Sequence, residues 1–260
     1  MALSDCSRVA HHIVDWLNRY IADIPSINGF IVGVSGGVDS ALVAMLCART
    51  GQQVILLNMP IRQASSEYDR AKKQIETIEN MYPNVRGMEL NLDSPFSALE
   101  MVFPSNVRVN QLAMANTRSR LRMLSLYAVG QEHQLLVTGT GNKIEDYGIG
   151  FFTKYGDGGV DISPIGDLYK SEVFELAQFL GIIPEILNAK PTDGLWGDEK
   201  SDEDQIGASY EELEFIMNLS IDTNISELTT RQREVKAIYD RMHRINQHKM
   251  KPIPICLIER

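Results

Sequence analysis

The chain has 260 residues, of which 44% are hydrophobic and 23% charged, and its formal net charge is -9. This composition is ordinary for a globular protein, and its acidic balance argues against a nucleic-acid coat or a polybasic membrane anchor. A chain of this length can bury roughly three quarters of its unfolded surface in one core. We therefore expect a single domain over residues 1–260.

The N-terminal stretch MALSDCSRVAHHIVDWL lacks the basic start and long apolar core of a signal peptide, and no apolar run is long enough to span a bilayer. The three cysteines, Cys6, Cys47 and Cys256, show no paired spacing. This favours reduced thiols over disulfides or a thiolate metal site. Together these features predict a cytoplasmic protein without a membrane partner.

Strand-like and helix-like patterns alternate through the first half of the chain. Apolar residues at helical spacing predict a first helix over 4–22, and a continuous apolar run at 30–34 indicates a strand covered on both faces. Further helices are expected over 39–51, 66–81 and 109–130, and further strands over 54–57, 87–90 and 134–138. This alternation predicts an α/β fold with a doubly wound parallel sheet.

After Gly139 the sequence is rich in glycine and poor in apolar periodicity, which indicates a long loop. Helices are expected over 171–180, 209–218 and 227–245, the first of them ending at Gly181. The acidic stretch PTDGLWGDEKSDEDQIG at 191–207 is predicted to be a mobile lid, because long loops in compact domains are usually functional or disordered.

The segment GFIVGVSGGVDSA joins the first strand to the following helix. Its glycine pair, Gly36 and Gly37, tolerates positive φ and allows close approach to a ligand. The loop amides and the helix N-terminus would point at an anion, with the hydroxyls of Ser35 and Ser40 as further donors. Because the loop lacks the lysine of a Walker A motif, it suits a phosphate whose charge is neutralised by Mg²⁺ on Asp39. The simpler alternative is a turn with Asp39 as the helix N-cap.

The motif SGGVDS after an apolar strand resembles the loop of N-type ATP pyrophosphatases, which split ATP between its α and β phosphates and adenylate a substrate. Within that group, FFTKYGDGG, NTRSRLRM, PTDGLW and a late His-Lys pair resemble the ammonia-dependent NAD synthetases, from about residue 30 to the C-terminus. The resemblance implies an adenine-nucleotide alpha-hydrolase-like (Rossmann-like) fold. It also implies a ligase that adenylates the nicotinate carboxylate of deamido-NAD and lets ammonia displace AMP.

The same resemblance implies roles for matching positions. ATP would be held by the phosphate loop and three residues beyond it: Gly33, Val34, Ser35, Gly36, Gly37, Val38, Asp39, Ser40, Thr140, Lys170 and the lid residue Thr192. Mg²⁺ would be bound by Asp39 and Glu145. Deamido-NAD would be bound by Arg120, Lys154, Asp161, His248 and Lys249. No residue is assigned to adenine, because Asn58 and Ser65 stand where some relatives carry arginine and glutamine.

Helical geometry separates three arginines of the motif NTRSRLRM. Arg118 and Arg122 are one turn apart and share a face, whereas Arg120 shares a stripe with Leu124 and Tyr127. Motif position selects Arg120 as the substrate ligand. In the simpler alternative all three arginines form a solvated basic face.

The resemblance further implies a homodimer with the dinucleotide site near the subunit interface. The predicted helix at 109–130 supports this, because its apolar residues occupy more than one face and the sheet covers one. We therefore expect a charge at Leu126 to lower assembly and activity together. The alternative is that the C-terminal helices cover the second face within one chain.

Two other functions stay open at this stage. One is another adenylating enzyme with the same loop, of the GMP-synthetase amidotransferase or tRNA-thiolating type; the lack of a basic extension and of a catalytic cysteine pair disfavours the latter. The other is a non-catalytic nucleotide-binding protein, which the presence of both carboxylates and Lys170 disfavours. Without a glutaminase region, free ammonia is the expected nitrogen donor.

Overall fold

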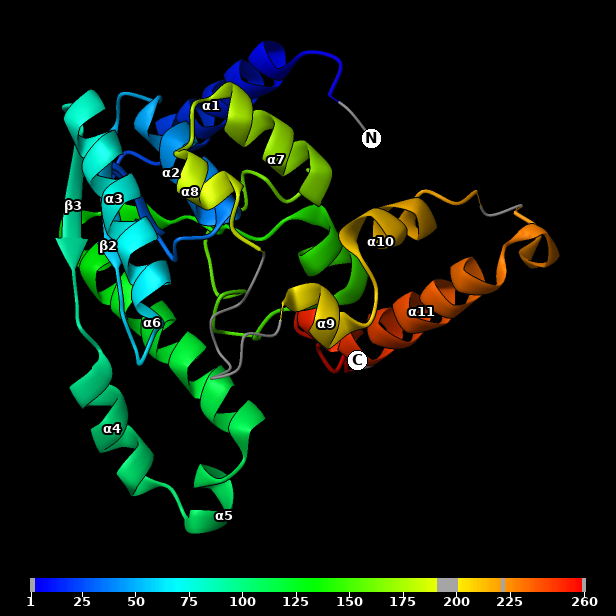
Figure 1. Cartoon of the computed structure of the whole chain (residues 1–260). Coiled ribbons are helices and arrows are strands. Elements are labelled where there is room, and N and C mark those ends of the chain that lie inside the picture. Colours follow the sequence, from blue (N-terminus) through cyan, green and yellow to red (C-terminus); the bar gives the residue numbers. More distant parts are fainter. Residues whose placement is uncertain (1–2, 191–200, 221–222, 259–260) are drawn as a thin grey trace.

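The computed structural model of the chain describes residues 3–190, 201–220 and 223–258. Within these ranges, parallel strands form a four-stranded sheet in the order β3-β2-β1-β4 (Figure 1). The strands are β1 (Gly29–Gly33), β2 (Gln53–Asn58), β3 (Val85–Glu89) and β4 (Leu135–Val137). The chain runs outward from β1 to β3 and then returns to the other side of β1 as β4. The predicted doubly wound parallel sheet is therefore confirmed, with its topological switch point between β1 and β4.

Helices cover both faces of this sheet because successive side chains of a strand point in opposite directions. On β1, Phe30 and Val32 pack into one hydrophobic cluster, whereas Ile31 packs into a second cluster on the other face. The first face is covered by α1 (Cys6–Ala22), α2 (Val38–Ala48), α3 (Ser65–Met81), α7 (Lys170–Phe179) and α8 (Pro184–Leu187). The second face is covered by α4 (Asp93–Val102) and α6 (Gln111–His133), which are joined through α5 (Ser105–Arg108).

A third hydrophobic cluster lies beside the sheet, where α10 and α11 extend to one side in Figure 1. It is formed by a π-helix (Lys143–Ile149), α9 (Asp202–Ile206), α10 (Tyr210–Met217) and α11 (Thr230–Met250), with a 3-10 turn (Ile225–Glu227) before α11. Ser209 and Thr229 begin α10 and α11 with capping boxes, which satisfy the first backbone amides of each helix. The prediction of a single domain stays a prediction.

The structure corrects three expectations about secondary structure. Helices α4 and α5 were not predicted, and the glycine-rich segment after Gly139 contains the π-helix. Part of the predicted lid, Asp202–Ile206, forms α9, so the expectation of a loop is wrong there. The rest of the lid, 191–200, lies outside the described residues, as does Thr192.

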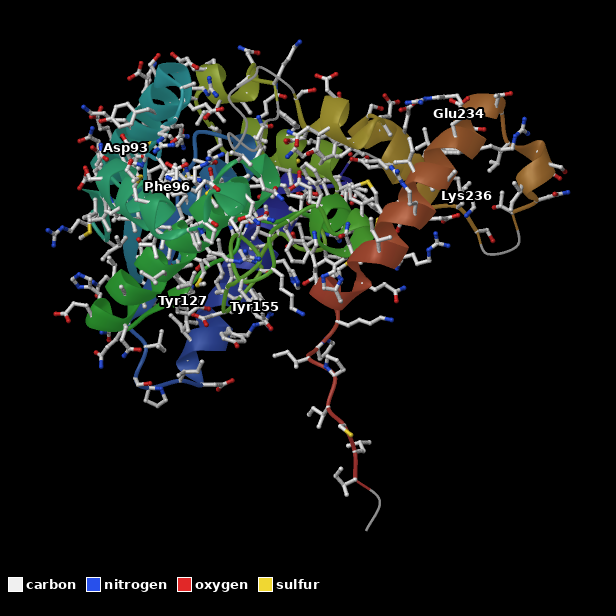
Figure 2. The ribbon with its side chains drawn as sticks, turned by 90° about the horizontal axis from the view of Figure 1, so that it is seen from below. Asp93, Phe96, Tyr127, Tyr155, Glu234 and Lys236 are labelled. Atoms are coloured by element: carbon white, nitrogen blue, oxygen red, sulfur yellow. The ribbon has the colours of Figure 1, made fainter. Side chains whose placement is uncertain are left out.

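Helix α6 presents an apolar stripe that the described residues do not cover. Leu112, Leu124 and Tyr127 are exposed on it, and Figure 2 looks onto the face that carries Tyr127. Leu126, in contrast, is half-buried in the second cluster and packs beside Gly33, so its predicted place on the uncovered face is wrong. The same figure shows the tail after α11 leaving the body, with exposed apolar side chains from Ile253 to Ile258.

Among the described helices, none combines the length and the apolar character that crossing a membrane requires.

Candidate active site

A cavity of about 270 Å³ opens at the carboxyl ends of β1 and β4, the edge at which doubly wound sheets bind ligands. The whole predicted phosphate loop, residues 33–40, lines it. Thr140, Glu145 and Lys170 line it as well, from segments at least a hundred residues away from the loop. The described residues predicted to bind ATP and Mg²⁺ are thus brought together.

The phosphate loop owes its shape to Gly36, whose φ is +87°. A Cβ there would lie 2.5 Å from the backbone oxygen of Glu67, so the close approach of α3 excludes any larger residue. Gly37 has an ordinary φ of -95° and is the N-cap of α2, so the alternative of Asp39 as N-cap is wrong. Asp39 instead projects from the first turn of α2, where the positive end of the helix dipole favours a negative charge.

Hydrogen bonds fix this loop from inside and outside. The hydroxyl of Ser40 donates to the Gly37 carbonyl at 3.0 Å and accepts from the Ser35 amide at 3.2 Å. From α3 and the turn before it, Arg70 Nε donates to the Gly36 carbonyl at 3.1 Å and Gln63 to the Ser35 carbonyl at 3.1 Å. Arg70 therefore adds a positive charge beside the loop. The loop motif does not predict this residue, because Arg70 lies one helix further along the chain.

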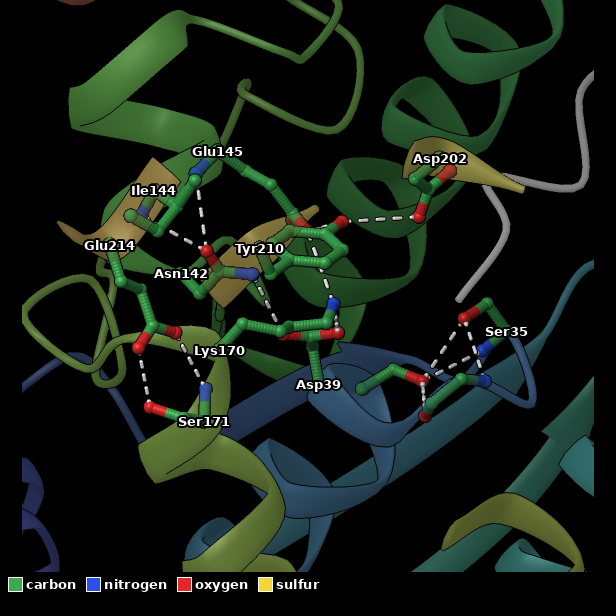
Figure 3. Close-up of polar contacts among 12 residues, drawn as sticks. Ser35, Asp39, Asn142, Ile144, Glu145, Lys170, Ser171, Asp202, Tyr210 and Glu214 are labelled. Carbon is green, nitrogen blue, oxygen red and sulfur yellow. Dashed lines mark hydrogen bonds and ion pairs between the residues drawn. The ribbon is translucent and has the colours of Figure 1, made fainter. Parts of the chain in front are cut away.

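Lys170 lies between the two predicted metal ligands (Figure 3). Its Nζ is 2.6 Å from Asp39 Oδ2 and 3.1 Å from Glu145 Oε1, and the lysine is only 4% exposed. Burial opposes the charged form, but the two carboxylates outweigh it and raise the pKa of Lys170 above its ordinary value. The Lys170 ammonium therefore bridges the carboxyl groups of Asp39 and Glu145 beside a loop suited to phosphate.

The five residues predicted to bind deamido-NAD do not line this cavity. Arg120 Nε donates to the Lys154 carbonyl at 3.3 Å, and Lys154 Nζ donates to the His248 carbonyl, so these three form a chain from α6 to α11. Lys249 donates to the carbonyls of Gly150 and Phe152, at 2.7 and 2.8 Å. These contacts hold the loop that follows the π-helix, in which Lys154 itself lies, against α6 and α11.

Asp161, the fifth of these residues, already has both carboxylate oxygens engaged within the chain. One oxygen accepts from the Tyr127 hydroxyl at 2.9 Å, and the other accepts from the Val137 amide at 2.8 Å. In this structure Asp161 therefore anchors the loop to β4 and α6.

The arginines of α6 differ from the expectation in one respect. Arg122 is half-buried and lines the cavity, with its Nε donating to the Met59 carbonyl at 3.0 Å. Burial and the neighbouring Arg118 lower its pKa to about 10. Arg118 lies over the ring of Phe96 at 5.5 Å, so the alternative of a solvated basic face is wrong for both. Helical geometry correctly grouped Arg118 with Arg122, but it did not show that their face turns inward.

The sequence profile of the NAD synthase family matches residues 9–253 of this chain. The chain belongs to the NAD synthase family. It is 39% identical to the NH(3)-dependent NAD(+) synthetase of Archaeoglobus fulgidus over 82% of this chain and 83% of that protein. It is 35% identical to the synthetase of the same name from Alkaliphilus metalliredigens over 93% of this chain and 96% of that protein.

Solved structures agree with this family assignment. The NMN synthetase of Francisella tularensis superposes with a TM-score of 0.86 at 29% identity, covering 98% of this chain and 99% of that one. The NH3-dependent NAD synthetase of Campylobacter jejuni, in complex with the nitrate ion, gives 0.77 at 25% identity, covering 97% and 100%. As a member of this family the protein is a ligase that forms carbon–nitrogen bonds, amidating deamido-NAD to NAD with ATP as co-substrate.

Proposed function

We propose that the cavity catalyses this amidation in two steps, with ammonia as the nitrogen donor. The nicotinate carboxylate attacks the α-phosphorus of ATP, which releases pyrophosphate and forms an adenylated substrate. Ammonia then attacks the activated carbonyl carbon, AMP leaves with the electron pair of the broken C–O bond, and the nitrogen releases one proton to water. The observation that carries the proposal is the meeting of Asp39, Glu145 and Lys170 beside a phosphate loop that has no Walker lysine.

In this mechanism the protein acts by positioning and electrostatics. The loop from Gly33 to Ser40 holds the departing pyrophosphate through its backbone amides. The Lys170 ammonium leaves the two carboxylates and pairs with the phosphates. Thr140 lines the same cavity, and we assign it a contact with ATP. No covalent enzyme intermediate is required, because adenylation already activates the carboxylate. Ammonia attacks with its own lone pair and needs no prior deprotonation.

The donor set of the cavity fits Mg²⁺. Within the described ranges, no group of three or more His, Cys, Asp and Glu side chains is placed to hold a metal ion by protein ligands alone. Asp39 and Glu145 supply two carboxylates, and Mg²⁺ usually binds through one or two carboxylates together with substrate phosphates. When bound, Mg²⁺ would offset the charge of the phosphates.

We place the deamido-NAD site around Arg120, Lys154, Asp161, His248 and Lys249, beside the ATP cavity, and complete it with a second copy of the chain. Two features support a homodimer. The stripe of Leu112, Leu124 and Tyr127 on α6 is exposed, and so is the apolar tail after α11. A twofold pairing is the commonest way to cover such surfaces. We also assign the enzyme to the cytoplasm, because its three cysteines are free thiols, as is usual there. The reaction requires no nucleic-acid partner.

The test is an incubation of the pure protein with ATP, Mg²⁺, ammonium and deamido-NAD, with all products quantified. We expect AMP, pyrophosphate and NAD in equal amounts, and glutamine should replace ammonium poorly. Formation of ADP and orthophosphate would contradict the proposal. Because one solved relative is an NMN synthetase, a parallel arm offers nicotinate mononucleotide, and a higher kcat/KM for it would reassign the preferred acceptor.

A further inference from the structure

Each of the two carboxylates beside Lys170 also receives a hydrogen bond from an uncharged side chain (Figure 3). For Asp39 the donor is Asn142, whose Nδ2 lies 3.0 Å from Asp39 Oδ1. Lys170 occupies the other oxygen, Oδ2. The rotation of the Asp39 carboxylate is therefore set by two donors, one on each oxygen.

Asn142 also fixes Glu145, but through the backbone. It is the N-cap of the π-helix, and its Oδ1 accepts from the amides of Ile144 and Glu145, both at 3.1 Å. The side chain is fully buried, with 0% exposure. One amide group thus links the helix that carries Glu145 to the carboxylate of Asp39, although the two acids are more than a hundred residues apart in sequence.

Tyr210, from α10, holds the Glu145 side chain. Its hydroxyl is 2.6 Å from Glu145 Oε1, the oxygen that Lys170 also contacts, and 3.3 Å from Asp202 Oδ2. The ring lies 4.8 Å from Lys170 Nζ and is packed in the third hydrophobic cluster. The hydroxyl is therefore held rigidly.

We propose that Asn142 and Tyr210 are positioning residues that orient Asp39 and Glu145 toward Mg²⁺ and the ATP phosphates. A neutral donor suits this task because it fixes a carboxylate without cancelling the charge that attracts a cation. Partners of this kind typically account for a factor of about 10–100 in metal affinity or activity. The inference rests on the proposed role of Asp39 and Glu145 as metal ligands.

The decisive variants are Asn142→Ser and Tyr210→Phe. A serine can still cap the π-helix, but its shorter side chain ends before Asp39. The phenylalanine keeps the ring and removes the hydroxyl alone. For each variant we expect the Mg²⁺ concentration for half-maximal rate to rise about 10–100-fold, with a smaller change in kcat at saturating Mg²⁺.

Binding of Mn²⁺, followed by electron paramagnetic resonance with a non-hydrolysable ATP analogue, gives a readout independent of turnover. The affinity for Mn²⁺ should fall by the same factor in both variants. Two control variants carry the same substitutions at residues that contact neither Asp39 nor Glu145. Asn110→Ser alters the exposed N-cap of α6, and Tyr169→Phe removes a buried hydroxyl that donates to Asn218 at 2.8 Å. In both controls the Mn²⁺ affinity should stay within about twofold of the wild-type value. That change is far smaller than the effect of about 10–100-fold expected for the two test variants.

Wild-type Mn²⁺ affinity in Asn142→Ser and Tyr210→Phe would overturn the positioning role while leaving the proposed reaction intact. Equal weakening in the two controls would also overturn it, because a general loss of stability would then explain the effect. Circular dichroism checks the fold. If Asn142→Ser fails to fold, Tyr210→Phe decides. The absence of AMP and pyrophosphate from the wild type would instead refute the proposed function.

Discussion

Replacing Lys170 with methionine should destabilise the folded protein markedly. The lysine is nearly fully buried, and its ammonium lies 2.6 and 3.1 Å from two carboxylates whose side chains are each 17% exposed. Methionine fills much of the same space but leaves Asp39 and Glu145 facing each other without a cation. Removing one member of a buried ion pair costs about 3–5 kcal/mol of unfolding free energy. At about 2–4 °C per kcal/mol for a chain of this size, Tm should fall by roughly 6–20 °C.

Magnesium should reverse part of this loss. In the wild type a divalent cation must displace the Lys170 ammonium, whereas in Lys170→Met the two carboxylates are open to it. Differential scanning calorimetry without nucleotide should therefore show a larger rise in Tm with added Mg²⁺ for the variant than for the wild type. Catalytic activity should stay low even with Mg²⁺, because the cation that moves to the phosphates is missing.

The pH dependence has a definite sign. The carboxylates raise the folded-state pKa of Lys170, despite burial, above its ordinary value of 10.5. The stabilisation is therefore fully present below that ordinary value and is lost only as pH rises through the folded-state pKa. The difference in Tm between wild type and variant should stay constant from about pH 6 to 9, where an ordinary lysine is also charged.

A surface pair provides the control. Lys143 contacts Asp167 at 2.8 Å, but the aspartate side chain is 96% exposed, and such pairs contribute about 0–1 kcal/mol. Lys143→Met should therefore barely change Tm. An unchanged Tm in Lys170→Met, or an equal response of variant and wild type to Mg²⁺, would refute the reasoning.

Three further predictions concern turnover and assembly. Asp39→Asn and Glu145→Gln should each slow turnover about tenfold to more than a hundredfold, since losing one charge-assisted contact costs about 1.5–3 kcal/mol; a near wild-type rate at limiting Mg²⁺ would show that the residue is not a ligand. In steady-state kinetics, Arg120→Ala should raise the KM for deamido-NAD, whereas Arg118→Ala should change it little. A larger rise in KM for Arg118→Ala than for Arg120→Ala would mean that the faces of α6 are misassigned. Leu124→Asp, at a side chain that is 60% exposed, should lower assembly and activity together in sedimentation and rate assays. A fully active wild-type monomer at micromolar protein would disprove both the dimer and the interfacial site.

Local sequence patterns predicted the sheet and the phosphate loop because both are determined by neighbouring residues. The apolar run of β1, the glycine that requires a φ of +87° and the first turn of α2 follow one another within a few positions. The motif positions of Glu145 and Lys170 were also sufficient to place them beside this loop. The strand-helix alternation then determined which edge of the sheet they share.

Contacts between distant segments were not predictable in this way. Nothing in a single sequence shows that Asn142 reaches Asp39, or that Asp202 in an acidic run is buried against Tyr210. Arg122 was missed for a related reason, since helical spacing gives relative directions but not which direction is inward. The role of the residues around Lys154 in binding deamido-NAD stays a prediction. Within a single chain these residues lie beside the cavity and do not line it.

The candidate active-site cavity lies at the boundary between separately packed hydrophobic clusters. The phosphate loop belongs to the sheet, whereas Tyr210 and the π-helix belong to the cluster of α9–α11. Across this boundary Glu214 accepts hydrogen bonds from the amide and hydroxyl of Ser171, at 2.9 and 2.7 Å. Regions of this kind can open as cooperative units without global unfolding, and a ligand that bridges them opposes the opening. In mild denaturant we therefore expect activity to disappear while β1 and β2 stay protected from hydrogen exchange, and ATP should slow exchange chiefly in α10 and α11.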